Sequence, residues 1–243
     1  MHQNSRSANR FLQSLSHSDF ELLAPHLRSA ELKYSAVLFE TGGEIDRIYF
    51  PLNGAISLVV PLGGGDVVEA GMFGRDGIVG AAAALDSATA VNQAVVQVHG
   101  QASVIGVAAI QSAARQSASL RAALYQYDQL LLVQAQQSAA CNTTHVVEER
   151  LCRWLLRTRD VLESDFLPLT QELVAQMLGV RRTSVTLVAS RLKEAKLIKY
   201  RRGRVEIIDL EGLQDSACEC YRAFKSQEAR LLGRAAVLDP AAV

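Results

Sequence analysis

The sequence has no long hydrophobic run, no excess of charge of either sign and few cysteines. None of its apolar segments approaches the ~20 residues that a membrane helix requires. The polar residues 1–9 lack the apolar core of a signal peptide. Lys plus Arg and Asp plus Glu both number 25, so the chain as a whole is neither basic nor acidic. We therefore expect a cytoplasmic protein of 243 residues that does not associate with membranes.

The cysteines and histidines argue against disulfide-rich and metal-dependent proteins. Cys141, Cys152, Cys218 and Cys220 form no disulfide framework and suit a reducing compartment. Cys218 and Cys220 make a Cys-x-Cys pair without a second pair or a neighbouring histidine, so we predict no metal site. An enzyme of the cupin type would need clustered ligands, which we do not find, and we predict neither an enzyme nor a cofactor. The histidines are scattered, at His2, His17, His26, His99 and His145.

One stretch, residues 169–193, predicts two short helices joined by a tight turn. Thr170 can cap the first helix by accepting a backbone N–H, and Gly179 supplies the permissive backbone of the turn. The second helix has an apolar stripe with the i, i+3, i+4, i+7 spacing of a buried face. Its opposite face begins with Arg and Thr, which can read base edges in a major groove. The apolar stripe consists of Val185, Val188, Ala189 and Leu192.

A hairpin with a basic tip follows this stretch. The alternating runs 197–200 and 205–208 are joined by residues 201–204, Arg-Arg-Gly-Arg, as in the wing of a winged helix-turn-helix. Between Arg181 and Arg204 there are nine Lys or Arg and one acid, a local charge typical of a DNA-binding face. The alternative is an ordinary helical hairpin with a solvated basic face. The predicted DNA-binding residues are Thr170, Arg181, Arg182, Thr183, Ser184, Thr186, Arg201, Arg202 and Arg204.

The preceding part of the chain predicts a β domain and a long helix. Residues 31–107 alternate short runs of Val, Ile, Tyr and Phe with Gly-rich turns, which indicates an antiparallel barrel or jelly roll. Residues 117–142 contain no Gly or Pro and have a stripe in alternating steps of four and three, as in a coiled coil. We expect this stripe to pair with a second subunit, and packing against the chain's own barrel is the alternative. The predicted dimerisation residues are Leu120, Leu124, Tyr127, Leu131, Gln134 and Ser138.

Barrel, long helix and C-terminal winged helix-turn-helix, in that order, resemble the Crp/Fnr superfamily of bacterial transcription regulators. The most specific matches are residues 43–50 (Gly-Glu-Ile-Asp-Arg-Ile-Tyr-Phe) with Gly54, and residues 179–185 (Gly-Val-Arg-Arg-Thr-Ser-Val). For the second of these segments, residues 179–185, the family normally has Gly-x-Ser-Arg-Glu-Thr-Val. The resemblance therefore places Arg182 on the family's guanine-reading Arg and Ser184 on its phosphate-contacting Thr.

Two departures from the family's motif bear on the operator sequence. Thr183 stands where the family has the Glu that reads cytosine, and Arg181 stands where it has a Ser cap. The half-site sequence of the cAMP-responsive or anaerobic regulators should therefore not be assumed.

The sensor half departs further from the family. Cyclic-nucleotide-binding members have a Glu for the ribose and an Arg for the phosphate, but the corresponding residues 77–80 and 92–94 contain neither. We therefore do not expect cAMP or cGMP as an effector, and Arg75, close in sequence, is our candidate effector-binding residue. No cysteine precedes Cys141, so the N-terminal iron–sulfur cluster of the oxygen-sensing branch is not expected.

The prediction is thus an α+β protein with an N-terminal antiparallel jelly-roll barrel, a long dimerisation helix and a C-terminal winged helix-turn-helix. We expect it to bind double-stranded DNA as a homodimer at a pseudo-palindromic operator, and to contact RNA polymerase if it activates transcription. The rival is a ligand-binding barrel whose DNA domain is vestigial. The predicted segments are 1–10, flexible tail; 11–116, sensor barrel; 117–142, dimerisation helix; 143–222, winged helix-turn-helix; and 223–243, C-terminal extension.

Overall fold

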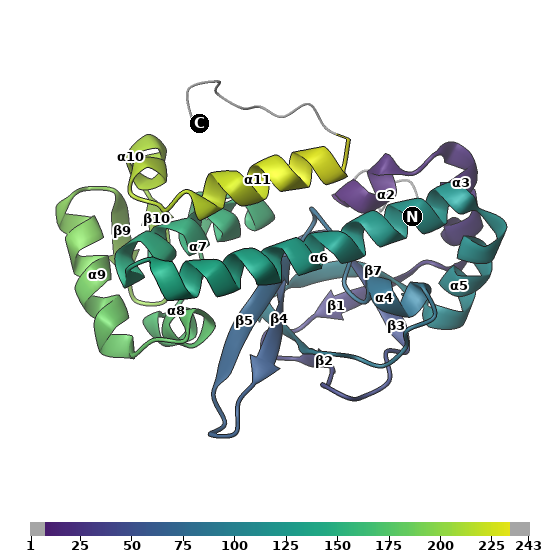
Figure 1. Ribbon diagram of the computed structural model, residues 1–243, viewed down its shortest axis with the longest axis horizontal. Coiled ribbons are helices and arrows are strands. Elements are labelled where there is room, and N and C mark those ends of the chain that lie inside the picture. Colours follow the sequence, from purple (N-terminus) through teal and green to yellow (C-terminus); the bar gives the residue numbers. More distant parts are fainter. Residues whose placement is uncertain (1–7, 234–243) are drawn as a thin grey trace.

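The computed structural model describes residues 8–233, in which a β sandwich, a long helix and a small helical domain follow one another along the chain (Figure 1). The sandwich lies beneath the long helix α6, and the helical domain lies at one end of it. The predicted α+β class is therefore confirmed. Within residues 8–233, no helix has the length and the apolar character that a membrane span requires.

The chain enters the described region through short helices, α2 (Arg10–Ser14) and α3 (His17–Leu23), followed by a 3-10 turn at Ala24–His26. Asn9 is fully buried and caps α2 by accepting the N–H of Leu12. Its amide group donates to two backbone carbonyls of the sandwich. The predicted flexible tail therefore ends too late, because Asn9 is fixed by the fold; residues 1–7 of that prediction lie outside the described residues.

Two antiparallel sheets form the sandwich, with strand orders β1-β7-β3 and β2-β6-β4-β5. The hairpin of β4 and β5 pairs Val60 with Val68, as the glycine-rich turn between them predicts. The short helix α4 (Ala81–Ala84) lies between β5 and β6. The strands are β1 (Arg28–Leu32), β2 (Val37–Phe39), β3 (Arg47–Pro51), β4 (Ala55–Pro61), β5 (Val67–Phe73), β6 (Gln93–Val98) and β7 (Gly100–Gly106).

Helix α5 (Val107–Gln116) leads into α6 (Ala118–Thr144), which begins after Ser117, whose hydroxyl accepts the N–H of Leu120. The stripe predicted for dimerisation faces the chain's own sandwich. Leu120 and Leu124 are 0% exposed and Tyr127 is 2% exposed within a single chain.

Further along the same stripe, Leu131 lies against Gly71 and Gln134 accepts the N–H of Met72 on β5 at 2.9 Å. Ser138 is half-buried. The predicted dimerisation residues are therefore wrong for this part of α6, and packing against the chain's own barrel is correct. A four-and-three stripe buries equally well on a sheet or on a second helix, so its spacing did not distinguish the two.

A second stripe on α6, which we call the outer stripe, is turned away from the sandwich. It also follows alternating steps of four and three, and most of its members are exposed. Tyr125 and Leu132 are large apolar side chains that are 57% and 48% exposed. The outer stripe consists of Ala118, Ala122, Tyr125, Gln129, Leu132, Gln136 and Ala139.

The helical domain contains a three-stranded sheet of order β8-β10-β9. Its last helix, α11, lies alongside α6 in Figure 1, and Phe224 of α11 joins the core of the sandwich. The boundary predicted between residues 222 and 223 is therefore wrong, because it falls within α11. The elements are α7 (Val147–Leu162), β8 (Phe166–Leu167), α8 (Gln171–Leu178), α9 (Arg182–Glu194), β9 (Ile198–Arg201), β10 (Arg204–Ile207), α10 (Leu210–Asp215) and α11 (Cys220–Leu231).

A buried ion pair fixes the helical domain to the sandwich. Nη1 of Arg157 on α7 lies 2.6 Å from Oδ2 of Asp76, and Nη2 donates to the carbonyl of Met72 at 2.6 Å. The guanidinium also lies 5.1 Å from the ring centre of Phe224. Burial alone would raise the pKa of Asp76, but the Arg157 charge and the N–H of Gly74 outweigh it and hold that pKa below its ordinary value. The pair therefore remains ionised inside the interface.

Candidate nucleic-acid interface

The helix-turn-helix has the local geometry that its sequence predicts. Helix α8 begins after Thr170, whose hydroxyl accepts the N–H of Leu173 at 3.1 Å. It ends at Gly179, whose φ of 62° is the left-handed conformation that favours glycine. The N–H of Val180 then bonds to the carbonyl of Ala175 at 3.0 Å, which closes the turn. These contacts fix the angle between α8 and α9.

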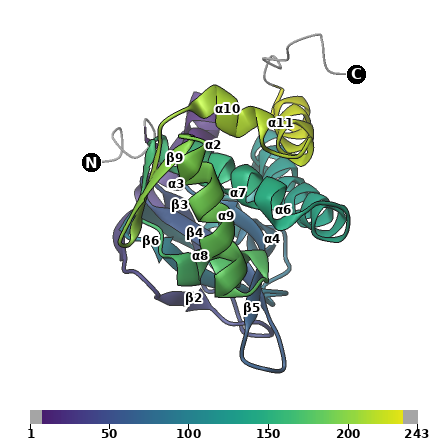
Figure 2. The same ribbon diagram turned by 90° about the vertical axis from the view of Figure 1, so that its left-hand side faces the viewer.

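Helix α9 has one buried and one open face, and Figure 2 shows α8 and α9 at the front of the helical domain. Its predicted buried stripe is confirmed, since all four members are buried. Arg181, the residue at its start, makes no side-chain cap, in agreement with its departure from the family's Ser. Of the residues predicted to read DNA on α9, Ser184 is half-buried. The exposed ones are Arg181, Arg182, Thr183 and Thr186.

Sequence reasoning missed Leu187, which is 56% exposed on this open face. It follows Thr183 by four residues, so helical spacing alone placed it on the same face. An exposed leucine on a groove-reading helix offers apolar contact to a thymine methyl group. Leu187 therefore shares the open face of α9 with the residues predicted to read bases.

Hydrogen bonds between α8 and α9 orient the open face. The hydroxyl of Thr186 donates to the side-chain carbonyl of Gln171 at 2.8 Å. Nη1 of Arg182 lies 3.5 Å from Oε2 of Glu172, and both side chains are exposed. An exposed ion pair contributes only ~0–1 kcal/mol, so Arg182 can exchange Glu172 for a base at small cost.

The predicted wing is present as the hairpin of β9 and β10. Arg201 pairs with Arg204 across a turn whose glycine, Gly203, has a φ of 72°. Arg201, Arg202 and Arg204 are exposed. The base of the wing is anchored by Tyr200, whose hydroxyl donates to the carbonyl of Leu169 at 3.0 Å. Burial raises the pKa of Tyr200 to about 12, so this hydroxyl keeps its proton.

A cleft of about 510 Å³ lies between the start of α8, the start of α9 and the wing. It brings together residues predicted for DNA binding from three separate elements, Thr170, Arg182 and Arg202. Two arginines beside a helix N-terminus form a surface that suits a phosphate group, although Glu172 also lines it. The full lining is Thr170, Gln171, Glu172, Arg182, Tyr200, Arg202 and Gly203.

The cavity between the sandwich and α6 is small. Its volume is about 70 Å³, and it is lined by Ile78, Asn92 and Asp128 among other residues. Arg75 does not line it: its Nη1 lies 2.7 Å from Oε2 of Glu163, and its Nε donates to a backbone carbonyl. The structure therefore gives no support to Arg75 as an effector-binding residue.

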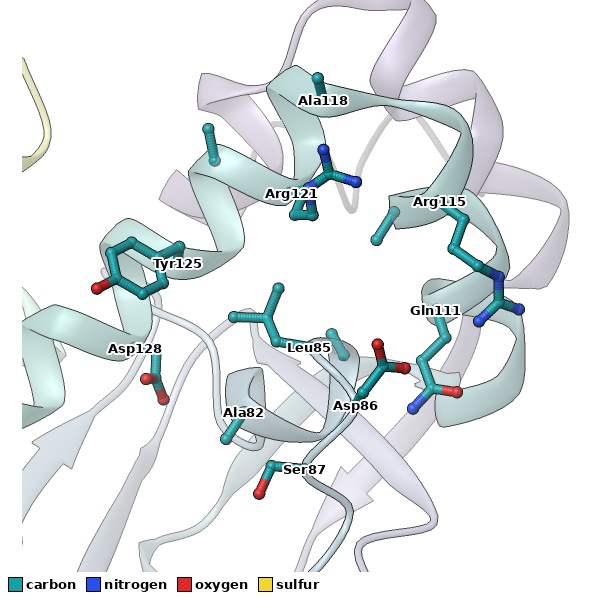
Figure 3. Close-up of a pocket in the computed structure, with 13 residues that line it drawn as sticks. Ala82, Leu85, Asp86, Ser87, Gln111, Arg115, Ala118, Arg121, Tyr125 and Asp128 are labelled. Carbon is teal, nitrogen blue, oxygen red and sulfur yellow. The ribbon is translucent and has the colours of Figure 1, made fainter.

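A larger cleft of about 780 Å³ opens beside the outer stripe, between α4, α5 and α6 (Figure 3). Arg115 and Arg121 lie at its rim, and Asp86 follows α4 on another side. Ala118 and Tyr125 of the outer stripe also line it. A molecule that covered the outer stripe would therefore also close this cleft.

The structure brings together four potential metal ligands that the sequence left apart. The ligand atoms of Cys141, His145, Cys218 and Cys220 all lie within 4.8 Å of one another. The sequence has no histidine beside Cys218 and Cys220, but the fold brings His145 to them. The i, i+4 spacing of Cys141 and His145 on one helix was the signal that could have found it.

Comparison with known proteins identifies the helix-turn-helix part of the chain. Residues 149–216 match the family model of the Crp-like helix-turn-helix domain. No curated protein sequence matches the chain.

Several solved structures are similar over most of the chain. FixK2 from Bradyrhizobium japonicum has a TM-score of 0.69 at 12% identity, over 79% of this chain and 98% of that one. The c-di-GMP responsive global regulator CLP of Xanthomonas campestris has a TM-score of 0.64 at 17% identity, over 79% and 99%. A CRP/FNR-family transcriptional regulator from Thermus thermophilus has a TM-score of 0.64 at 21% identity, over 78% and 98%. The predicted likeness to this superfamily is confirmed at the level of the fold.

Proposed function

We propose that this chain, which has the fold of the Crp/Fnr regulators and a Crp-like helix-turn-helix domain, binds double-stranded DNA sequence-specifically as a transcription regulator. The observation that supports this most strongly is the shared surface of α9 and the wing. Nine Lys or Arg lie between Arg181 and Arg204, and all are exposed. Three of them are in exposed ion pairs, with Glu172, Glu148 and Glu206. This function requires no catalytic residue.

The residues divide into base-reading and phosphate-binding groups. Arg182, Thr186 and Leu187 project from α9, where a major groove would receive them. Arg202 lies in the turn of the wing, which in a complex would stand beside rather than within that groove, so that Arg202 would bind phosphates. Loss of a base-reading residue should therefore depend on the operator sequence, whereas loss of a phosphate-binding residue should not.

The partner in this proposal is a second copy of the chain, bound through the outer stripe of α6. Heptad spacing and the exposed apolar residues Tyr125 and Leu132 support this face, because two such stripes can interlock as a coiled coil. A twofold axis would place two α9 helices about one helical turn of DNA apart, roughly 34 Å, on a pseudo-palindromic operator. A regulator of this kind that activates transcription would also contact RNA polymerase.

Binding of the operator without cAMP or cGMP is part of the proposal. A cavity of about 70 Å³ is far below the ~300–1,000 Å³ of ordinary ligand pockets. Ile78 and Asn92, which stand near the expected nucleotide contacts, supply neither a carboxylate nor a guanidinium. Each missing charge-assisted contact would forfeit ~1.5–3 kcal/mol.

The test measures DNA binding across operator variants. Genomic fragments bound by the purified protein give the operator, and single-base changes in it are then titrated by fluorescence anisotropy. Arg182→Ala should cost ~1–3 kcal/mol and relax discrimination at one base pair per half-site. Arg202→Ala should weaken all variants alike and lower the salt slope by about one. Arg222→Ala, an exposed arginine on α11, is the matched control and should bind as wild type.

Two results would contradict the proposal. Equal losses on every operator variant for Arg182→Ala would remove its base-reading role. Failure of the wild-type protein to retain any genomic fragment would favour the rival function, a barrel module with a vestigial DNA domain.

A further inference from the structure

Three cysteines and one histidine converge where the long helix ends. Cys141 lies in the last turn of α6 and His145 directly follows that helix, whereas Cys218 precedes α11 and Cys220 is its first residue. Sγ of Cys141 lies 3.5 Å from Sγ of Cys218, and Sγ of Cys220 lies 3.6 Å from Nδ1 of His145. All three cysteines are buried. These residues lie outside the surface described for DNA.

The distances match those of a tetrahedral ion. Zinc binds thiolate sulfur at ~2.3 Å and imidazole nitrogen at ~2.0–2.1 Å, which in a tetrahedron puts two sulfurs about 3.8 Å apart and sulfur and nitrogen about 3.5 Å apart. All four ligand atoms already lie within 4.8 Å of one another. We propose that Cys141, Cys218, Cys220 and His145 bind one thiophilic cation, Zn²⁺, in a Cys3His site.

The histidine is oriented for this role by a carboxylate. Nε2 of His145 lies 3.1 Å from the carboxylate of Glu219, the residue between the two C-terminal cysteines. A hydrogen on Nε2 that bonds to Glu219 leaves the lone pair of Nδ1 directed at the sulfurs. Carboxylate–histidine–metal arrangements of this kind fix the tautomer and the ring orientation in zinc proteins. The hydroxyl of Thr144 lies 3.2 Å from Nδ1, and the metal replaces that contact.

The surroundings suit the charge of the site. Three thiolates, a neutral imidazole and Zn²⁺ have a net charge of −1, which needs a positive neighbour. Arg153 on α7 interacts electrostatically with Cys141. Its Nε is buried and has no hydrogen-bond partner among the described residues. A negatively charged metal site would offset the charge of this guanidinium, which also interacts electrostatically with the carboxylate of Glu69.

Four protein ligands leave no open coordination position, so the site is structural rather than catalytic. It joins the last turn of α6 to the segment that leads into α11. An iron–sulfur cluster fits less well, because its cysteines must surround an inorganic core and their sulfurs would stand farther apart.

The test uses the full-length protein, freed of metal with a chelator and kept reduced. Native mass spectrometry during zinc titration should detect one ion per chain, and Co²⁺ should give the visible absorption of a tetrahedral thiolate complex. Cys141→Ser and Cys220→Ser should abolish both signals. Glu219→Gln should keep the site but weaken zinc binding ~10–100-fold. Cys152→Ala is the matched control, because Cys152 is buried elsewhere and does not belong to the cluster.

Wild-type protein alone decides the outcome if a variant fails to fold. Zinc should raise its thermal unfolding midpoint, since the ligands are assembled only in the folded chain. A folded wild type that takes up neither zinc nor cobalt overturns the proposal. So does a mass two hydrogens lower that reports a Cys141–Cys218 disulfide in reduced preparations, or the presence of iron with sulfide. None of these measurements involves DNA, so they stand or fall separately from the proposed function.

Discussion

Replacing Arg157 by methionine should destabilise the whole molecule. Arg157→Met removes a guanidinium that binds Oδ2 of Asp76 and the carbonyl of Met72, both at 2.6 Å. The side chains of Arg157 and Asp76 are only 7% and 3% exposed, so water cannot replace the lost partner. The variant leaves a buried carboxylate without its counter-charge, which is more costly than the ion pair is stabilising.

Removal of one partner of a buried pair costs ~3–5 kcal/mol. In a protein of 150–250 residues each kcal/mol lowers the unfolding midpoint by roughly 2–4 °C, so we expect a loss of about 6–20 °C. Arg159→Met is the matched control. Arg159 lies on the same helix and binds Asp165 at the same 2.6 Å, but its side chain is 31% exposed and that of Asp165 is 50% exposed. Its loss should cost only ~0–1 kcal/mol.

Urea unfolding measures both variants, and the single tryptophan, Trp154, reports the transition because it lies on α7 and donates to Glu69 of the sandwich. The pKa of Asp76 is lowered in the folded protein, so its stabilisation is complete above the ordinary pKa of ~3.9 and is lost as pH falls through the lower folded value. In Arg157→Met, burial without Arg157 favours the protonated carboxyl group. The difference in the free energy of unfolding between wild type and Arg157→Met should therefore become smaller in acid. Equal losses for Arg157→Met and Arg159→Met, or a gap independent of pH, would refute this reasoning.

Three further predictions concern the dimer, the turn and the effector. Leu132→Glu on the outer stripe should give a monomer by sedimentation and abolish operator binding. The control Gln126→Glu, exposed beside the stripe, should remain dimeric. A dimeric Leu132→Glu variant would exclude the outer stripe as the dimer interface. Gly179→Ala should lose ~1–2 kcal/mol in urea unfolding, because its left-handed φ strains a side chain and the new Cβ would lie 3.2 Å from Val68. Calorimetry with cAMP or cGMP should detect no micromolar binding, and DNA titrations should be unchanged by either nucleotide; tighter operator binding with one of them would disprove this.

Local signals in the sequence predicted the local structure well. The cap at Thr170, the turn at Gly179 and the basic hairpin each depend on a few neighbouring residues whose backbone preferences are strong. Thr144 is an exception. Its side chain could cap the helix that follows, but its hydroxyl bonds back to the carbonyl of Ala140, and Thr144 is the last residue of α6. A threonine offers both bonds, and only the packing of the helix decides between them.

The features that sequence reasoning missed depend on contacts between distant segments. Spacing showed that α6 has an apolar stripe, but it could not show that the sandwich covers that stripe and leaves another open. In the cysteine cluster, Cys141 and Cys218 are in contact although most of the sequence of the helical domain lies between them. For this reason the pair Cys218-x-Cys220 looked isolated in the sequence. Arg75 was chosen for its nearness in sequence to the expected nucleotide site, whereas the direction of its side chain is decided by Glu163, directly after α7.

The packing of α11 has a consequence for the stability of the chain while it is being synthesised. Phe224 fills part of the sandwich core and covers the guanidinium of Arg157, although both of its neighbours are translated much earlier. While α11 is still in the ribosome, the sandwich has its strands but lacks Phe224, and the ion pair of Arg157 with Asp76 is open to water on that side. The sandwich therefore reaches its final stability only after the helical domain has emerged. A nascent chain would be expected to remain sensitive to proteases until that moment.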